Sequence, residues 1–253
     1  MKTSVVTGGA SGIGLELSKL LIQDNYKVFI IDNNNKNLQK LKTCLDTNSF
    51  EGIKEDMSSV SSPKKIYNKL KDKNIEVLVN NAGFGDFGKF HKSDWKRDEK
   101  MINLHVLNTT HLTKLFLQDM VKKNNGKILN ISSVAAFQPG PLMSLYYATK
   151  AYILHFTEAI ADEVQDKNIC ISALCPGQTN TNFQKSVSSK KNKIKFNTSC
   201  PVKVAKYGYE ALKANNTISI PGYFNKFLVF LNRLLPRNIV TKIVRYIQEK
   251  NRN

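Results

Sequence analysis

Two adjacent tyrosines stand shortly before a lysine in the segment LYYATKAY, residues 145–152. Residues four apart share one face of a helix, so Tyr146 pairs with Lys150, whereas Tyr147 at that spacing meets only Ala151. A tyrosine hydroxyl has an ordinary pKa of about 10, and a neighbouring ammonium group lowers that pKa because it favours the phenolate. The pair therefore predicts a proton-transfer site, with an exposed surface helix as the alternative.

A glycine-rich segment, TGGASGIG at residues 7–14, lies between an apolar run and a helical pattern. Its glycines, Gly8, Gly12 and Gly14, allow a tight turn and a close approach of the backbone to a pyrophosphate. The following helix offers free N–H groups and the positive end of its dipole at the same place. The spacing is GxxxGxG, and in this strand–turn–helix context it predicts a dinucleotide-binding turn.

An acidic residue, Asp32, ends the second apolar run, 18 residues after Gly14. Its carboxylate could accept hydrogen bonds from the adenosine ribose hydroxyls and would repel a 2′-phosphate. Neither Ser11 nor Asn33 supplies a cation for that phosphate, so we expect NAD as the cofactor, while Lys36 leaves NADP open. Asp32 could also cap the helix that follows.

Short apolar runs rich in β-branched residues alternate with helical patterns along the chain. Near-continuous apolar strands separated by helices are typical of a parallel sheet that is covered on both faces. The expected fold is therefore α/β, a doubly wound parallel sheet of the Rossmann type. The predicted strands are 3–7, 27–32, 75–79, 127–132 and 169–174, with helices between them.

Composition restricts the class of protein. The 253 residues and a hydrophobic share of 41% suit one domain, and no apolar run approaches the length of a membrane-spanning helix. The formal net charge is +18, but only five of the 38 basic residues are Arg and no nucleic-acid motif accompanies them, so we expect no nucleic-acid partner.

Four cysteines without CxxC pairing indicate reduced thiols in a cytoplasmic protein that begins without a signal peptide. The four histidines show no ligand spacing, so we predict no metal and interpret them as surface or core residues.

Five short motifs follow one another: TGGASGIG (7–14), NNAG (80–83), ISS (131–133), YYATK (146–150) and PG (176–177). In this order and spacing they resemble the short-chain dehydrogenase/reductase family over residues 1–182. Residues 207–236 resemble the DltE-like bacterial branch of that family. The resemblance implies a nicotinamide cofactor and the interconversion of an alcohol and a ketone or aldehyde by hydride transfer.

The resemblance also assigns four catalytic residues. In this family the serine precedes the tyrosine by 13 residues, so Ser133 selects Tyr146, and counting from the second tyrosine would reach Val134, which has no hydroxyl. The asparagine of the central helix corresponds to Asn103. We expect Tyr146 to act as general acid or base, Lys150 to hold the nicotinamide ribose, Ser133 to bind the substrate oxygen, and Asn103 to hold a water in a proton relay. The second tyrosine would belong to the substrate wall or the core.

Further cofactor contacts follow from the same resemblance. They are Ser11 and Ile13 in the glycine turn, Asp56 at the adenine edge, Asn81, Ala82 and Gly83 against the adenosine, Pro176 and Gly177 beside the nicotinamide, Thr179 at the carboxamide, and Thr181 near the phosphates.

The C-terminal part departs from the strand–helix alternation. We expect a single domain over 1–253, with a core at 1–182 followed by a substrate loop and an amphipathic C-terminal segment over 183–253. The polar, basic stretch 184–200 is either a mobile loop beside the ligand crevice or an ordinary surface insertion. Apolar stripes within 224–247 alternate with basic residues, and they could cover the domain or a substrate pocket, form the interface of a homodimer or homotetramer, or lie on an anionic membrane surface.

The sequence as a whole favours a nicotinamide-dependent oxidoreductase that acts on an apolar alcohol or carbonyl substrate, such as an acyl, steroid-like or lipid-derived one. One alternative is a catalytically silent dinucleotide-binding sensor or scaffold, which Tyr146→Phe would leave unaffected. Another is a nucleic-acid or membrane adaptor that relies on the net charge.

Overall fold

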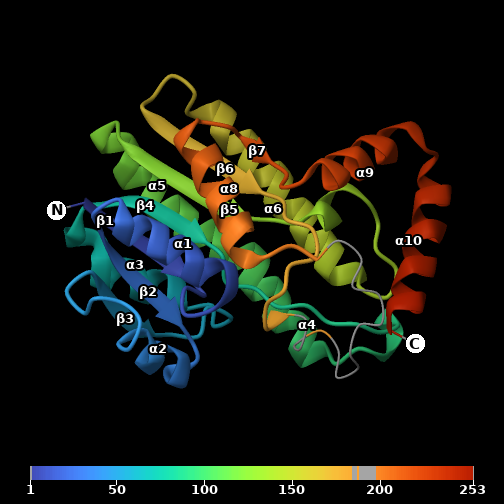
Figure 1. Cartoon of the computed structure of the whole chain (residues 1–253), viewed down its shortest axis with the longest axis horizontal. Coiled ribbons are helices and arrows are strands. Elements are labelled where there is room, and N and C mark those ends of the chain that lie inside the picture. Colours follow the sequence, from blue (N-terminus) through green and yellow to red (C-terminus); the bar gives the residue numbers. More distant parts are fainter. Residues whose placement is uncertain (1, 184–186, 188–197, 253) are drawn as a thin grey trace.

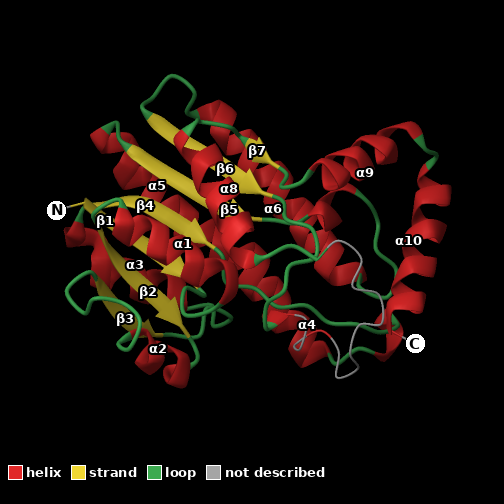
Figure 2. Ribbon diagram, in the orientation of Figure 1, coloured by secondary structure: helices red, strands yellow, loops and turns green. Residues whose placement is uncertain are grey.

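A computed structural model describes residues 2–183, 187 and 198–252, so most of the predicted loop at 184–200 lies outside the described residues. Seven parallel strands form one sheet in the order β3-β2-β1-β4-β5-β6-β7, and helices cover both of its faces (Figures 1 and 2). The predicted doubly wound Rossmann architecture is confirmed.

The elements succeed one another as strand and helix along most of the chain. The strands are β1 (Lys2–Thr7), β2 (Tyr26–Asp32), β3 (Phe50–Lys54), β4 (Ile75–Asn80), β5 (Gly126–Ile131), β6 (Ile169–Leu174) and β7 (Ile218–Ser219). The α-helices are α1 (Gly12–Gln23), α2 (Asn35–Leu41), α3 (Ser62–Leu70), α4 (Trp95–Ile102), α5 (Thr109–Lys123), α6 (Ser144–Glu163), α8 (Pro201–Lys213), α9 (Tyr223–Leu234) and α10 (Arg237–Arg252).

Alternate strand residues build two separate cores, one on each face of the sheet. In β1, Val6 packs in the core that α1 and α8 cover, whereas its neighbour Val5 packs in the core that α3 and α5 cover. Because both faces are buried, the strands read as continuous apolar runs, and five of them were predictable for that reason. The edge strands β3 and β7 were not predicted, since β3 contains Glu51, Gly52 and Lys54 and β7 has only two residues.

A buried row of amide and hydroxyl groups joins the two central strands to the helices beneath them. Asn80 at the end of β4 donates to Thr113 Oγ1 on α5 (2.9 Å) and to Asn130 Oδ1 on β5 (2.8 Å). Asn130 in turn donates to Thr157 Oγ1 on α6 (2.9 Å). All four side chains are buried, so these bonds hold the carboxyl ends of β4 and β5 in a defined position relative to α6.

The last two helices stand beside the sheet rather than on its faces. Figure 1 shows α9 and α10 beyond the carboxyl ends of the strands, where α10 ends the described chain. In the parts of the chain that the structure describes, no helix has the length and apolar character needed to cross a membrane.

Candidate active site

A pocket of about 920 Å³ follows the carboxyl ends of the strands, where ligands bind in open α/β sheets. It is long enough to be lined by the glycine turn at one end and by α9 and α10 at the other. Of the predicted site residues, Asn103 and Gly14 do not line it. Those that do are Gly8, Ser11, Gly12, Ile13, Asp32, Asp56, Asn81, Ala82, Gly83, Ser133, Tyr146, Lys150, Pro176, Gly177, Thr179 and Thr181.

The glycine turn after β1 requires glycine at two of its positions. Gly8 and Gly12 have φ values of +62° and +56°, which L side chains rarely adopt. A Cβ on Gly8 would also lie 2.9 Å from Ala82 Cα, so the turn can pack against the chain after β4 only without a side chain there. The turn leads into α1, whose first N–H groups face the same end of the pocket.

Asp32 is held rigidly at the pocket wall. Its Oδ2 accepts the Ala10 N–H at 3.2 Å and its Oδ1 accepts the Asn34 N–H at 2.9 Å, and the residue is only 8% exposed. The cap of α2 is Asn34, whose side chain accepts from Asn37 N, so the alternative reading of Asp32 as that helix cap is wrong. Among Asn33, Asn34, Lys36 and Asn37, the three asparagines line the pocket and the lysine does not.

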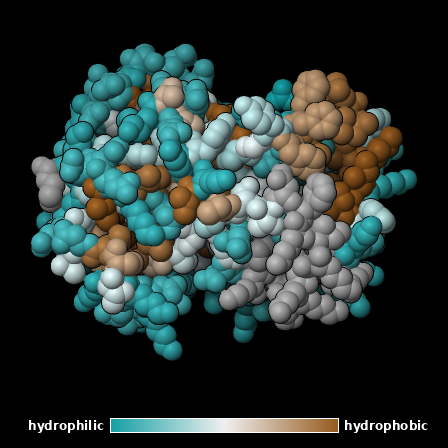
Figure 3. Space-filling model, in the orientation of Figure 1, coloured by the Kyte–Doolittle hydropathy of each residue, from teal (hydrophilic) through white to brown (hydrophobic). Residues whose placement is uncertain are grey.

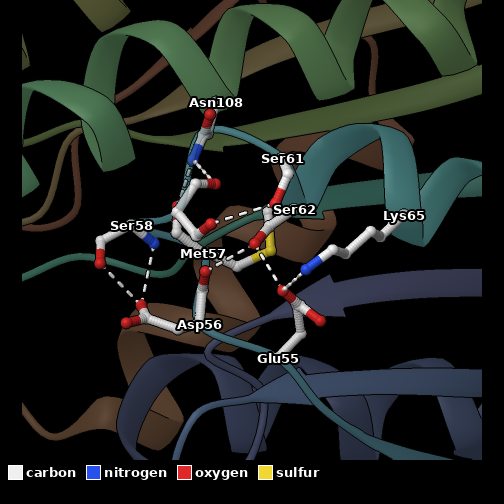
Figure 4. A network of polar contacts seen from close by, with 9 residues as sticks. Glu55, Asp56, Met57, Ser58, Ser61, Ser62, Lys65 and Asn108 are labelled. Atoms are coloured by element: carbon white, nitrogen blue, oxygen red, sulfur yellow. Dashed lines mark hydrogen bonds and ion pairs between the residues drawn. The ribbon is translucent and has the colours of Figure 1, made fainter.

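The turn after β3 is built by a dense set of polar contacts (Figure 4). Asp56 Oδ1 accepts both the backbone N–H and the hydroxyl of Ser58, at 2.9 and 2.8 Å. Two residues from neighbouring helices hold the same turn. Asn108, just before α5, donates to the Met57 carbonyl at 2.6 Å, and Ser62, the first residue of α3, has its Oγ 2.6 Å from Glu55 Oε1. These bonds fix the turn so that Asp56 and Met57 face the pocket.

The NNAG segment is attached to the glycine turn by its own amide. Asn81 Nδ2 donates to the carbonyls of Thr7 and Gly8, each at 3.0 Å. In return, Thr7 Oγ1 accepts the N–H groups of Asn81 and Ala82 at 3.0 and 3.1 Å. The two loops therefore form one rigid wall of the pocket.

Ser133 and Tyr146 meet across the pocket from different elements. Ser133 follows β5, where its Oγ accepts the Ala135 N–H at 3.1 Å, and Tyr146 lies in the first turn of α6. Burial raises the pKa of the Tyr146 hydroxyl above its ordinary value, and a hydrogen bond with the Ser133 side chain opposes that increase only in part. The phenol is therefore protonated at neutral pH.

Lys150 lies one helical turn beyond Tyr146, as the spacing predicted. Its Nζ donates to the Ile131 carbonyl at 2.8 Å and stands 5.7 Å from the centroid of the Tyr146 ring. Burial lowers the pKa of Lys150 to about 8. The lowering of the Tyr146 pKa that we expected from Lys150 stays a prediction, since burial of the phenol dominates the pKa of Tyr146 in this structure.

His105 is a buried part of the site that the sequence did not single out. Its Nε2 accepts the Phe84 N–H at 3.3 Å, so Nδ1 carries the proton and donates to Thr149 Oγ1 at 2.9 Å. Thr149 then donates to the Tyr146 carbonyl at 2.9 Å. Burial lowers the pKa of His105 well below its ordinary value, so a neutral imidazole links the NNAG loop to the helix that carries Tyr146.

Asn103 begins a short π-helical segment, Asn103–Asn108, between α4 and α5. It is half-buried, and the next residue, Leu104, reaches the pocket wall instead. π-Helical turns often occur at functional sites. The relay role expected for Asn103 stays a prediction.

The far end of the pocket is apolar and is closed by the C-terminal helices. Gln248 on α10 donates to the Tyr147 hydroxyl at 2.8 Å, and Asn232 on α9 donates to Gln138 Oε1 at 2.7 Å. The second tyrosine thus belongs to the pocket wall. The apolar stripes that the sequence indicated as a possible pocket cover contribute Phe224, Leu228, Val244 and Ile247 to this wall. Two further lining residues, Met143 and Phe183, were not indicated by the sequence.

The residues present fit a nicotinamide dinucleotide. The side-chain-free turn at Gly8 and Gly12 leaves room for a pyrophosphate, and the fixed Asp32 carboxylate supplies acceptors for ribose hydroxyls. Lys150 and Tyr146 stand beside the opposite half of the pocket. Among the described residues, no group of His, Cys, Asp or Glu is arranged to hold a metal ion.

Comparison with known proteins gives a consistent result. A family model described as "short chain dehydrogenase" matches residues 2–192. The 17-beta-hydroxysteroid dehydrogenase type 3 of Mus musculus is 31% identical over 75% of this chain and 64% of its own length. The very-long-chain 3-oxoacyl-CoA reductase of Bos taurus is 29% identical over 72% of this chain and 61% of its own length, so the matched part spans less than two thirds of either relative.

Solved structures share the fold at low sequence identity. A short-chain dehydrogenase from Sphingobium yanoikuyae in complex with NADPH superposes with a TM-score of 0.81 at 23% identity, over 88% of this chain and 89% of that one. A short-chain dehydrogenase/reductase from Burkholderia phymatum in complex with NAD gives a TM-score of 0.79 at 20% identity, over 91% of this chain and 92% of that one.

Proposed function

This chain belongs to the short-chain dehydrogenase/reductase family, and from that membership we propose that it reduces an apolar ketone to a secondary alcohol with a nicotinamide dinucleotide as hydride donor. The cofactor is NAD(P), which supplies the hydride when bound. The protein's own residues bind and orient the substrate and deliver the proton.

The proton would come from Tyr146. Because burial keeps the phenol protonated, Tyr146 is suited to donate a proton to the oxygen of a carbonyl that is being reduced. The Ser133 hydroxyl would hydrogen-bond the same oxygen and stabilise the charge that develops on it. Lys150, as an ammonium below its pKa of about 8, would favour the phenolate that is left after the transfer. The placement of Tyr146, Ser133 and Lys150 around one pocket supports this proton transfer, and a protonated phenol is the form that reduction requires.

The substrate class follows from the far end of the pocket. The aromatic and aliphatic side chains of α6, α9 and α10 surround that end, and Tyr146 packs against Phe183 with ring centroids 5.4 Å apart. A bulky apolar group, such as an acyl chain or a steroid-like ring system, would bury the most surface there. The names of the two curated relatives refer to 3-oxoacyl and hydroxysteroid compounds, which agrees with this proposal.

For the cofactor we favour NAD over NADP, because the fixed carboxylate of Asp32 would repel a 2′-phosphate and the three neighbouring asparagines offer no cation. The expected homodimer or homotetramer and the cytoplasmic location stay predictions, and light scattering tests the first of them.

A spectrophotometric screen tests the proposal. The purified chain is given NADH or NADPH and ketones of increasing size, and oxidation of the cofactor is followed by its absorbance. We expect kcat/KM to rise with the size of the apolar group. Cofactor binding without turnover of any ketone would favour the alternative of a silent sensor.

A further inference from the structure

The C-terminal arm, which we define as α9 and α10, exposes an apolar stripe to solvent. On α9, four side chains at positions i, i+4, i+7 and i+11 share one helical face. They are Tyr223, Phe227, Phe230 and Leu234, exposed by 91, 59, 57 and 65%. On α10 the exposed apolar residues are Ile239, Ile243, Tyr246 and Ile247. Figure 3 shows apolar residues gathered over this arm.

The α9 part of the stripe is separate from the residues that attach the arm to the protein, whereas Tyr246 and Ile247 of α10 also border the pocket. Val229 and Val240 are buried, and the side-chain amides of Asn232 and Gln248 bond to the core. The arm is therefore anchored by its inner residues, and the outer stripe is not needed to close the core. An exposed patch of this kind marks an interaction surface.

The charges around the stripe indicate what it binds. Residues 223–253 contain seven Lys and Arg and one acid, Glu249, which pairs with Arg245 at 3.0 Å. Lys226 and Arg233 lie on α9 along one border of the stripe, where helical spacing places them beside Phe230 and Leu234. A second copy docked through the same surface would bring two sets of these cations into one interface, and the arm has only Glu249 to balance them, which disfavours self-association.

We propose that the arm docks on an anionic lipid bilayer, with the stripe buried in the headgroup region and the cations against acidic lipids. An amphipathic helix with bulky apolar residues on one face and Lys or Arg beside it binds such surfaces without spanning them. The amphipathic rings of Tyr223 and Tyr246 suit the membrane–water boundary.

Vesicle sedimentation with the full chain tests the proposal. The protein is mixed with vesicles of phosphatidylcholine alone or with about one third phosphatidylglycerol, and the bound fraction is measured at low and high salt. We expect strong binding to the acidic vesicles, weak binding to the neutral ones, and weaker binding as salt increases.

Two pairs of variants separate the apolar and the ionic contributions. Phe227→Ser with Phe230→Ser should reduce the partition coefficient at least about tenfold. Lys226→Glu with Arg233→Glu should reduce it at least about 25-fold, at roughly fivefold per cation. None of these four residues lines the pocket, so activity on a water-soluble ketone should not change.

Matched controls come from the rest of the chain. Phe90→Ser with Trp95→Ser removes aromatic rings that are 61 and 62% exposed, and Lys122→Glu with Lys203→Glu reverses exposed charges. These controls should bind vesicles like the unchanged chain. The proposal is overturned if acidic vesicles do not bind, if the controls lose as much binding as the arm variants, or if Phe227→Ser with Phe230→Ser splits a dimer while vesicle binding stays the same.

Discussion

Replacing Asp32 by asparagine should relax the cofactor preference of this protein. The side chain keeps its size but loses its charge. In the structure, bonds to the Ala10 and Asn34 N–H groups prevent the carboxylate from turning away from the pocket. A 2′-phosphate would therefore meet a fixed negative charge.

The size of the effect follows from Coulomb's law. Two unit charges about 6 Å apart at an effective dielectric constant of about 20 repel by about 3 kcal/mol. That energy corresponds to a factor of about 100 in a dissociation constant. Allowing for water in an open pocket, we expect the ratio of the NADPH Kd to the NADH Kd to fall by about 10- to 100-fold in Asp32→Asn.

Calorimetric titration of the purified chain with each cofactor measures this ratio. Asp56→Asn is the control, since Asp56 also faces the pocket but is exposed and bound to Ser58, so the change should affect both cofactors by a similar factor. The reasoning fails if the unchanged chain binds NADPH more tightly than NADH, or if Asp32→Asn changes the ratio by less than about threefold.

Three further results are expected. Because burial lowers the pKa of Lys150 to about 8, its ammonium is lost above that value, so kcat for reduction should decrease as pH rises through about 8; a profile that stays flat to about pH 10 would contradict this. Asn130→Ala removes the partner of Asn80 and Thr157, so chemical denaturation should show a loss of about 2–4 kcal/mol, whereas the exposed Asn48→Ala should change stability by less than about 0.5 kcal/mol. Tyr147→Phe removes the bond from Gln248, so KM should rise by about 3- to 10-fold while kcat stays within about twofold, and a collapse of kcat would show that Tyr147 rather than Tyr146 has the chemical role.

The fold was predictable where burial on both faces makes a strand apolar throughout. Strands such as β2 and β6 satisfy that condition. β3 does not, because Gly52 and Lys54 lie on an edge strand that is partly exposed. Local patterns thus reveal the centre of a parallel sheet more readily than its edges.

The site was predictable where its residues belong to short motifs at strand ends. Tertiary contacts between distant segments were not, and Gln248 reaches Tyr147 over a separation of 101 residues. The role of His105 depends on the same kind of contact, since its partners Phe84 and Thr149 come from a loop and from another helix.

The pKa of Tyr146 was the property of the site that could least be predicted from the sequence. The spacing of Tyr146 and Lys150 correctly predicts a nearby cation, but no spacing reports how strongly the pocket desolvates a phenol. The two effects have opposite signs, and their balance depends on the surrounding residues.

The most direct test of the proposed chemistry is Tyr146→Phe, assayed for turnover of an accepted ketone and for cofactor binding in the same preparation. If the phenol donates the proton, kcat should fall by at least about 100-fold while the Kd of the cofactor stays within about threefold. A variant that keeps more than about a tenth of the normal kcat would show that the proton comes from another group.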